Sequence, residues 1–205
     1  MNLFLVAAGA VVVAGGIACV TARRAAVVAI GAAILLGATP LLALPLPGLP
    51  VLAERAVGAL LAGELLWVGL RGRTVAGASA LGWPPMALLA AAAFGAGVGA
   101  QQLVPATGPP EALGVALALF TVAIVAVAGR SDGIHLGLSA LVLIAATSVV
   151  RVAMSGPSSA LETLLVSAVG AAAAAAVAVL APRLEADEAA GDGPTGAPPG
   201  SGVRP

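Results

Sequence analysis

Apolar runs of about twenty residues follow one another along most of this chain, separated by short breaks that contain arginine, proline or other polar residues. A helix of that length crosses a hydrocarbon core about 30 Å thick and satisfies its own backbone hydrogen bonds in lipid. The runs lack the strict alternation that is typical of strands. The pattern therefore predicts an all-α fold, a polytopic transmembrane helix bundle of about seven helices near residues 2–20, 25–45, 53–70, 82–101, 112–128, 135–154 and 161–181.

Prolines interrupt the second run and open the fourth, so a bundle of six helices is the alternative. Pro40 lies inside the second run, where it removes a backbone donor, and we expect a kink there. The fourth run begins with Trp83-Pro84-Pro85, and prolines are tolerated in the first turn of a helix. A count of six would place both ends of the chain on the same side of the membrane.

Arginines mark the breaks, and their distribution predicts an orientation. Short cytoplasmic loops are enriched in positive residues. With the N-terminus outside, only Arg55 and Arg151 fall outside, whereas the following arginines fall inside: Arg23, Arg24, Arg71, Arg73, Arg130 and Arg183. This favours seven crossings with a cytoplasmic C-terminus. We expect residues 1–182 to form the helical bundle and residues 183–205, which are rich in Gly, Pro and acidic residues, to form a disordered cytoplasmic tail.

Composition supports the membrane assignment and excludes other classes. Of the 205 residues, 60% are hydrophobic and 9% are charged, whereas soluble domains carry roughly a quarter charged residues. The net charge is zero and lysine is absent, so nucleic-acid binding is excluded. The lipid bilayer is the expected surrounding. The abundance of Ala, Gly and Arg is typical of a GC-rich bacterial genome, and we expect the protein in the bacterial inner (cell) membrane.

Glu64 is the most informative candidate for chemistry, because it lies within the apolar segment 59–68. We expect it about 10 Å inside the cytoplasmic end of its helix. A carboxylate at that depth faces the bundle interior, pairs with a cation or stays protonated, and all three options suit a proton relay. The alternative is a neutral glutamic acid that only packs against a neighbouring helix.

Other polar residues give weaker signals. His135 is expected at the inner end of the sixth helix, where water would reach it, and is a second proton-relay candidate. Arg151 has two alternatives, extending to the interface or forming an ion pair with Glu162. Glu54 and Arg55 are interpreted as markers of a helix start. No spacing indicates a metal site, a nucleophile with its base or a phosphate loop, so we expect no cofactor and no metal.

The segment Pro105-Ala106-Thr107-Gly108, followed by Ala112-Leu113, Val115-Ala116-Leu117 and Phe120, resembles the second half of the hydrogenase-4 component E family, as does Met86-Ala87-Leu88-Leu89-Ala90-Ala91 upstream. These proteins are membrane subunits of formate hydrogenlyase-type complexes, partly related to subunit K of respiratory complex I. The resemblance implies a subunit of a membrane oxidoreductase complex. That family carries acidic residues in its later helices, whereas residues 138–150 here offer only Ser139, Thr147 and Ser148.

Three functions compete. The first is a small integral subunit of a cation- or proton-translocating membrane complex, structural or proton-conducting, with other membrane subunits as partners and no catalysis of its own. The alternative is a stand-alone carrier for a small solute, which would predict internal repeats with broken helices and polar groups at the midplane. The third, an intramembrane enzyme, requires several polar groups at one depth, and only Glu64 is expected deep in the membrane.

Overall fold

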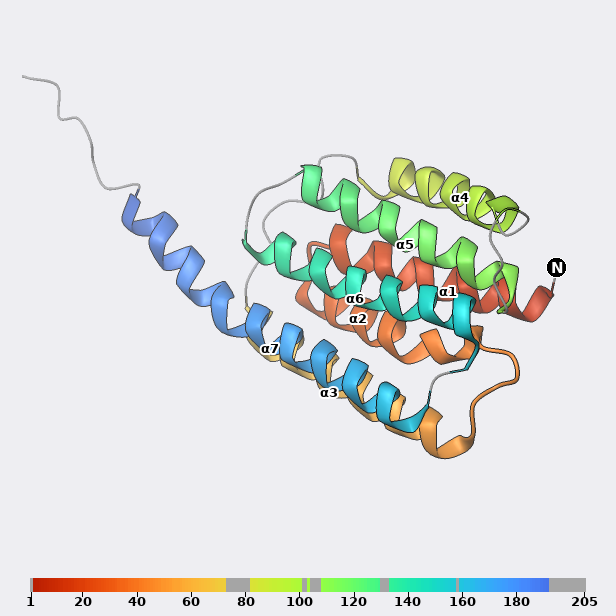
Figure 1. Ribbon diagram of the computed structural model, residues 1–205. Helices are drawn as coiled ribbons and strands as arrows, with labels where there is room; N and C mark the ends of the chain where they lie inside the picture. The colour runs from red at the N-terminus through yellow and green to blue at the C-terminus, as the bar shows by residue number, and fades with distance from the viewer. Residues whose placement is uncertain are drawn as a thin grey trace, which may run out of the picture.

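The structure, a computed structural model, describes residues 2–72, 82–100, 103, 108–129, 133–157 and 159–191, with side chains as far as residue 181. Within these ranges the chain forms helices and connecting turns (Figure 1). The helices are α1 (Leu3–Thr21), α2 (Ala25–Ala38), the 3-10 helix η1 (Thr39–Leu42), α3 (Leu49–Leu70), α4 (Trp83–Ala100), α5 (Pro110–Gly129), α6 (Gly133–Ser155) and α7 (Ala160–Gly191). The predicted all-α bundle of seven helices is confirmed.

Six segments in the described part of the chain are long and apolar enough to cross a membrane. They are α1, α2 together with η1, α4, α5, α6 and residues Ala160–Ala181 of α7. The remaining helix, α3, has 22 residues but carries Glu54, Arg55 and Glu64. It packs along α2 on one side and α7 on the other. The protein is therefore a multi-span membrane protein in which α3 packs between α2 and α7 at one edge of the bundle.

Successive helices run in opposite directions, so the start of α1 and the end of α7 lie at opposite ends of the bundle (Figure 1). We call these the N-terminal end and the C-terminal end of the bundle. The exposed Arg23, Arg24 and Arg71 follow α1 or α3 and lie at the C-terminal end. Because the bundle begins at one end and finishes at the other, the arrangement agrees with an odd number of α-helices running between the two ends.

Two helix boundaries differ from the sequence-based prediction. The second helix was expected to reach residue 45, but α2 ends at Ala38 and continues as η1, because Pro40 provides no backbone donor. The last helix was expected to end near residue 181, but α7 continues to Gly191 and extends beyond its neighbours (Figure 1). The final part of the expected tail, residues 192–205, lies outside the described residues, as do Arg73 and Arg130.

Glycines allow the closest helix contacts in the bundle. A Cβ atom added to Gly15 of α1 would lie 2.9 Å from the carbonyl oxygen of Gly31 in α2, and one added to Gly31 would lie 2.8 Å from that of Gly15. Both distances are shorter than any real Cβ contact. The two backbones can therefore touch only because glycine has no Cβ atom. In lipid such close approach replaces the hydrophobic effect as the main source of helix association.

Candidate functional site

A buried arginine lies near the N-terminal end of the bundle, where α2, η1, α3 and α7 meet. Arg55 is only 4% exposed. It donates three hydrogen bonds, from Nε to the carbonyl oxygen of Leu36 (2.9 Å), from Nη1 to Ser167 Oγ (3.3 Å) and from Nη2 to Thr39 Oγ1 (3.2 Å). All three acceptors are neutral oxygens. The preceding Glu54 lies close enough for an attractive charge interaction, but no hydrogen bond joins the two side chains.

Pro40 explains why the arginine is needed there. In an uninterrupted α-helix the carbonyl oxygen of Leu36 would accept the N–H of residue 40, and proline has none. In the structure this oxygen accepts from Thr39 Oγ1 at 3.0 Å and from Arg55 Nε at 2.9 Å. An unsatisfied carbonyl in hydrocarbon would cost several kcal/mol. Arg55 therefore replaces a backbone donor that the helix break removes.

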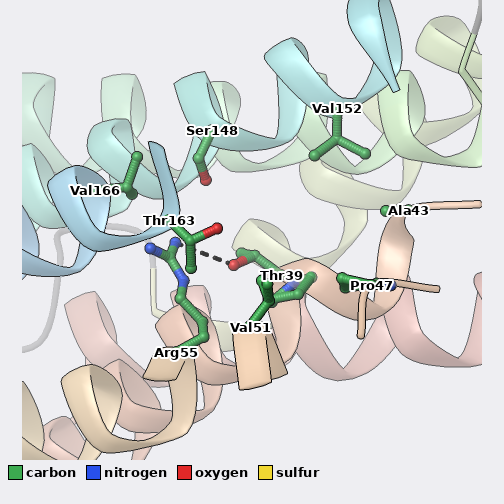
Figure 2. A pocket seen from close by; sticks show the side chains of 10 residues that line it. Thr39, Ala43, Pro47, Val51, Arg55, Ser148, Val152, Thr163 and Val166 are labelled. Carbon is green, nitrogen blue, oxygen red and sulfur yellow. Dashed lines mark hydrogen bonds between the residues drawn. The ribbon is translucent and has the colours of Figure 1, made fainter. Parts of the chain in front are cut away.

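A small cavity of about 30 Å³ lies beside the guanidinium group (Figure 2). Its polar wall consists of Arg55, Thr39, Ser148 and Thr163, and the rest of its lining is apolar. Each of the three hydroxyl groups donates to a backbone carbonyl of its own helical segment. The hydroxyl oxygens therefore offer lone pairs, while two of the five guanidinium N–H groups have no acceptor among the described residues. The cavity therefore offers both donors and acceptors, and its volume suits about two water molecules.

Glu64 faces away from the bundle, so the expectation that it faces the interior is wrong. The buried stripe of α3 consists of Arg55, Ala59, Ala62, Gly63, Leu66 and Leu70. Glu64 follows this stripe by one position, which rotates it by about 100° around the helix axis, and its side chain is exposed. It forms no hydrogen bond or ion pair with any described residue. Two of the three options predicted from the sequence remain. Glu64 pairs with a cation outside the described part of the chain, or it stays protonated.

Glu64 lines an open groove of about 370 Å³ between α2 and α3. We call it the α2/α3 groove, and its lining residues are Ala26, Ala29, Ile30, Ala33, Leu60, Gly63, Glu64 and Trp67. The two helices approach closely at Gly63, where an added Cβ would lie 3.2 Å from both the Ala29 carbonyl oxygen and the Ala33 Cβ. This close contact leaves a floor of small residues, with exposed larger side chains on either side.

Trp67 and Arg71 indicate the depth of Glu64. The Arg71 guanidinium carbon lies 5.1 Å from the centre of the Trp67 ring, and both side chains are exposed. Tryptophan and arginine are typical of the membrane–water interface. Glu64 lies one helical turn further from the C-terminal end of the bundle, about 4.5 Å deeper than Trp67.

His135 does not lie where the sequence suggested. It is 2% exposed and belongs to the buried face of α6, so the expected contact with water is wrong. Ser139, one turn further along α6, is fully buried, and its Oγ has no hydrogen-bond partner among the described residues. Glu64 faces outward from α3, whereas His135 faces inward from α6. The structure does not bring the two relay candidates together.

Arg151 and Glu162 form an ion pair across the connection between α6 and α7. Glu162 Oε2 also accepts the backbone N–H of Ser159 at 2.9 Å, and the backbone N–H of Glu162 donates to Ser159 Oγ at 3.3 Å. This reciprocal pattern is a capping box at the start of α7. Both charged side chains are partly exposed, at 35% and 42%. Of the two alternatives for Arg151, the structure shows the pair, and its role there is to close a helix connection.

No group of three or more His, Cys, Asp or Glu side chains in the described part of the chain is arranged to hold a metal ion. A comparison with protein-family models, with curated proteins and with solved structures found no match. Two polar features of α3 bear on function, the buried Arg55 and the outward Glu64.

Proposed function

We propose that this protein is a small integral subunit of a cation- or proton-translocating membrane complex, with Glu64 as its proton-carrying group at the contact with a larger partner subunit. One observation carries the proposal. Glu64 is an acid on the outer face of a membrane bundle, one helical turn further from the C-terminal end than Trp67 and without a partner among the described residues. A surface made only to face lipid would not place a carboxyl group there.

The energetics favour a carboxyl group that exchanges its proton. Translocon insertion scales give about 2.5–3.5 kcal/mol for a charged side chain such as aspartate at the centre of a membrane helix, and less near the interface. In lipid alone the carboxyl group avoids this cost by binding a proton. A partner cation about 4 Å away contributes about 4 kcal/mol at an effective dielectric constant of 20, enough to stabilise the ionised form.

The rest of the described chain is more typical of a subunit of a larger complex than of a protein that translocates ions by itself. Its interior is filled mainly by Ala, Val and Leu, and the buried Arg55 is held by three hydrogen bonds, one of them to the carbonyl oxygen freed by Pro40. The resemblance to hydrogenase-4 component E suggests the class of partner, a membrane-bound oxidoreductase of the hydrogenase-4 or complex I type. We place the complex in a bacterial inner membrane with Arg23, Arg24 and Arg71 on the cytoplasmic side.

A second candidate is a stand-alone carrier for a small solute, and the cavity beside Arg55 favours it. A buried cation inside a membrane bundle often marks a substrate path. The cavity of about 30 Å³ is far smaller than the roughly 300–1,000 Å³ of typical ligand sites. It therefore suits water better than an organic solute, which places this candidate second.

Proton uptake by vesicles that contain the assembled complex tests the proposal. Glu64→Gln keeps the shape of the side chain and removes its titration, so uptake is expected to be abolished at equal amounts of assembled complex. Glu54→Gln is the matched control, because it changes a second acid of the same helix, nearly three turns away. Uptake is expected to persist in that variant. Normal uptake in Glu64→Gln would remove Glu64 from the mechanism and leave a purely structural subunit.

A further inference from the structure

The shape and charge of the α2/α3 groove identify what covers it. We propose that the groove docks a transmembrane helix of the partner subunit, and that this helix carries one lysine or arginine at the depth of Glu64. The inference rests on the proposed function, since it names the chemistry of the partner at the same site. It assigns the groove one occupant, a membrane helix with a single intramembrane cation.

The floor of the groove suits a helix. Small residues recur along α2 at Ala26, Ala29 and Ala33, and Gly63 faces them from α3. Residues 26–33 and 60–67 each rise by about 10 Å, or two helical turns. Small residues repeated over such a length allow another helix backbone to approach closely, which is the usual basis of helix association in lipid.

The charge of the groove requires a cation rather than a neutral donor. Glu64 is the titratable side chain in the lining, and no described residue supplies it with a hydrogen bond or an ion pair. Arg71 lies near the same face but its guanidinium group is placed over the Trp67 ring. A charge pair offsets more of the cost of an intramembrane carboxylate than a neutral hydrogen bond does. A lipid chain would fill the groove without supplying the positive charge that stabilises the carboxylate.

The side chains that form the walls of the groove would contribute to recognition of the docked helix. Trp67 lines the groove one turn from Glu64, and its ring already interacts with one cation, Arg71. A lysine or arginine that reaches Glu64 from a docked helix would pass close to the indole, whose face attracts cations. Leu60 and Ile30 are 63% and 59% exposed and would be covered by the same helix. One docked helix would therefore satisfy the acid and remove the largest apolar side chains of the groove from lipid.

Site-specific photo-cross-linking in the native membrane tests the proposal. A photoreactive residue at position 60 is expected to give one discrete protein adduct, and one at position 88 of α4, where Leu88 is 74% exposed, serves as the control for an outward position elsewhere. Fragmentation of the adduct is expected to identify a transmembrane segment with a lysine or arginine within one turn of the cross-linked residue. A segment without a cation, a second copy of this chain, or adducts with lipid alone would each overturn the proposal.

A charge exchange adds a test that does not depend on one variant folding well. Glu64→Lys is expected to lower the adduct yield at least ten-fold, and replacing the partner cation with glutamate is expected to restore it in the Glu64→Lys background. Failure of the exchange to restore the adduct would refute the charge pair. If Glu64→Gln stops proton uptake while the cross-link proves unrelated to a cation, this inference fails and the proposed function stands. If the exchange succeeds while uptake is normal in Glu64→Gln, the proposed proton role fails and the docking contact stands.

Discussion

Replacing Arg55 with methionine is expected to destabilise the bundle, and the loss should shrink when Pro40 is also replaced with alanine. Arg55 donates three hydrogen bonds, and a hydrogen bond to a charged group contributes about 1.5–3 kcal/mol. Removing the guanidinium group also removes the cost of burying a charge, which is several kcal/mol. The two effects oppose each other, so we expect a net loss of about 2–3 kcal/mol in the free energy of unfolding.

The alanine at position 40 changes this loss because it supplies a backbone N–H. That donor can bond to the carbonyl oxygen of Leu36, which in the structure accepts from Arg55 Nε and Thr39 Oγ1. One of the three acceptors then no longer depends on Arg55. The double-mutant cycle is therefore expected to show a coupling of about 1 kcal/mol between Arg55→Met and Pro40→Ala.

Unfolding of the purified protein in mixed micelles, followed by far-ultraviolet circular dichroism as SDS is added, measures all four variants of the cycle. Arg71→Met is the matched control, because it removes an exposed arginine at the opposite end of the same helix. It should change stability by less than about 0.5 kcal/mol and should be additive with Pro40→Ala. Additivity of Arg55→Met with Pro40→Ala within experimental error would refute the idea that Arg55 compensates for the proline.

Three further outcomes follow from the packing and the topology. Gly31→Leu should cost about 1–3 kcal/mol in the same unfolding assay, since its Cβ would lie 2.8 Å from the Gly15 carbonyl oxygen; wild-type stability would contradict the backbone contact of α1 with α2. Arg151→Gln should cost less than about 1 kcal/mol, because its pair with Glu162 is partly exposed, and a larger loss would indicate a buried network. A topology reporter inserted at Pro109 should lie outside and one fused after residue 191 should be cytoplasmic, and activity of both on one side would refute the seven-helix arrangement.

The helices were predictable because the signal for a membrane helix is its length of apolar sequence, which is strong for α1, α5 and α6. The boundaries of α2 and α7 were less predictable. The last turn of α2 depends on how the chain accommodates Pro40, and the sequence was compatible with either a kink or an earlier end. The extension of α7 to Gly191 lies in an Ala- and Glu-rich segment, whose high helix propensity competes with the polar composition that suggested a tail.

The ion pair of Arg151 with Glu162 was accessible from sequence because both residues lie beside one short connection. Burial of His135 was not, since its position near the start of α6 suggested water and only the tertiary packing places it on the inner face. In a helix that is apolar all round, hydrophobic periodicity carries no information about which face is buried. The assignment of polar residues to the interior or to the surface is therefore the weakest step of such a prediction.

The spacing of Arg55 and Glu64 in the sequence carries information about which face of α3 is buried. They are nine residues apart on α3, or two and a half turns, so they must face opposite sides of the helix. If one is buried, the other faces outward. Residue size decides between the two possibilities, because Ala59, Ala62 and Gly63 share the face of Arg55 while larger side chains face outward, and small residues are typical of contacts between membrane helices. Pro40 agrees, since the carbonyl that it frees is open to a donor from a neighbouring helix such as Arg55. Glu64, on the opposite side of α3 from Arg55, therefore lies on the surface of the bundle.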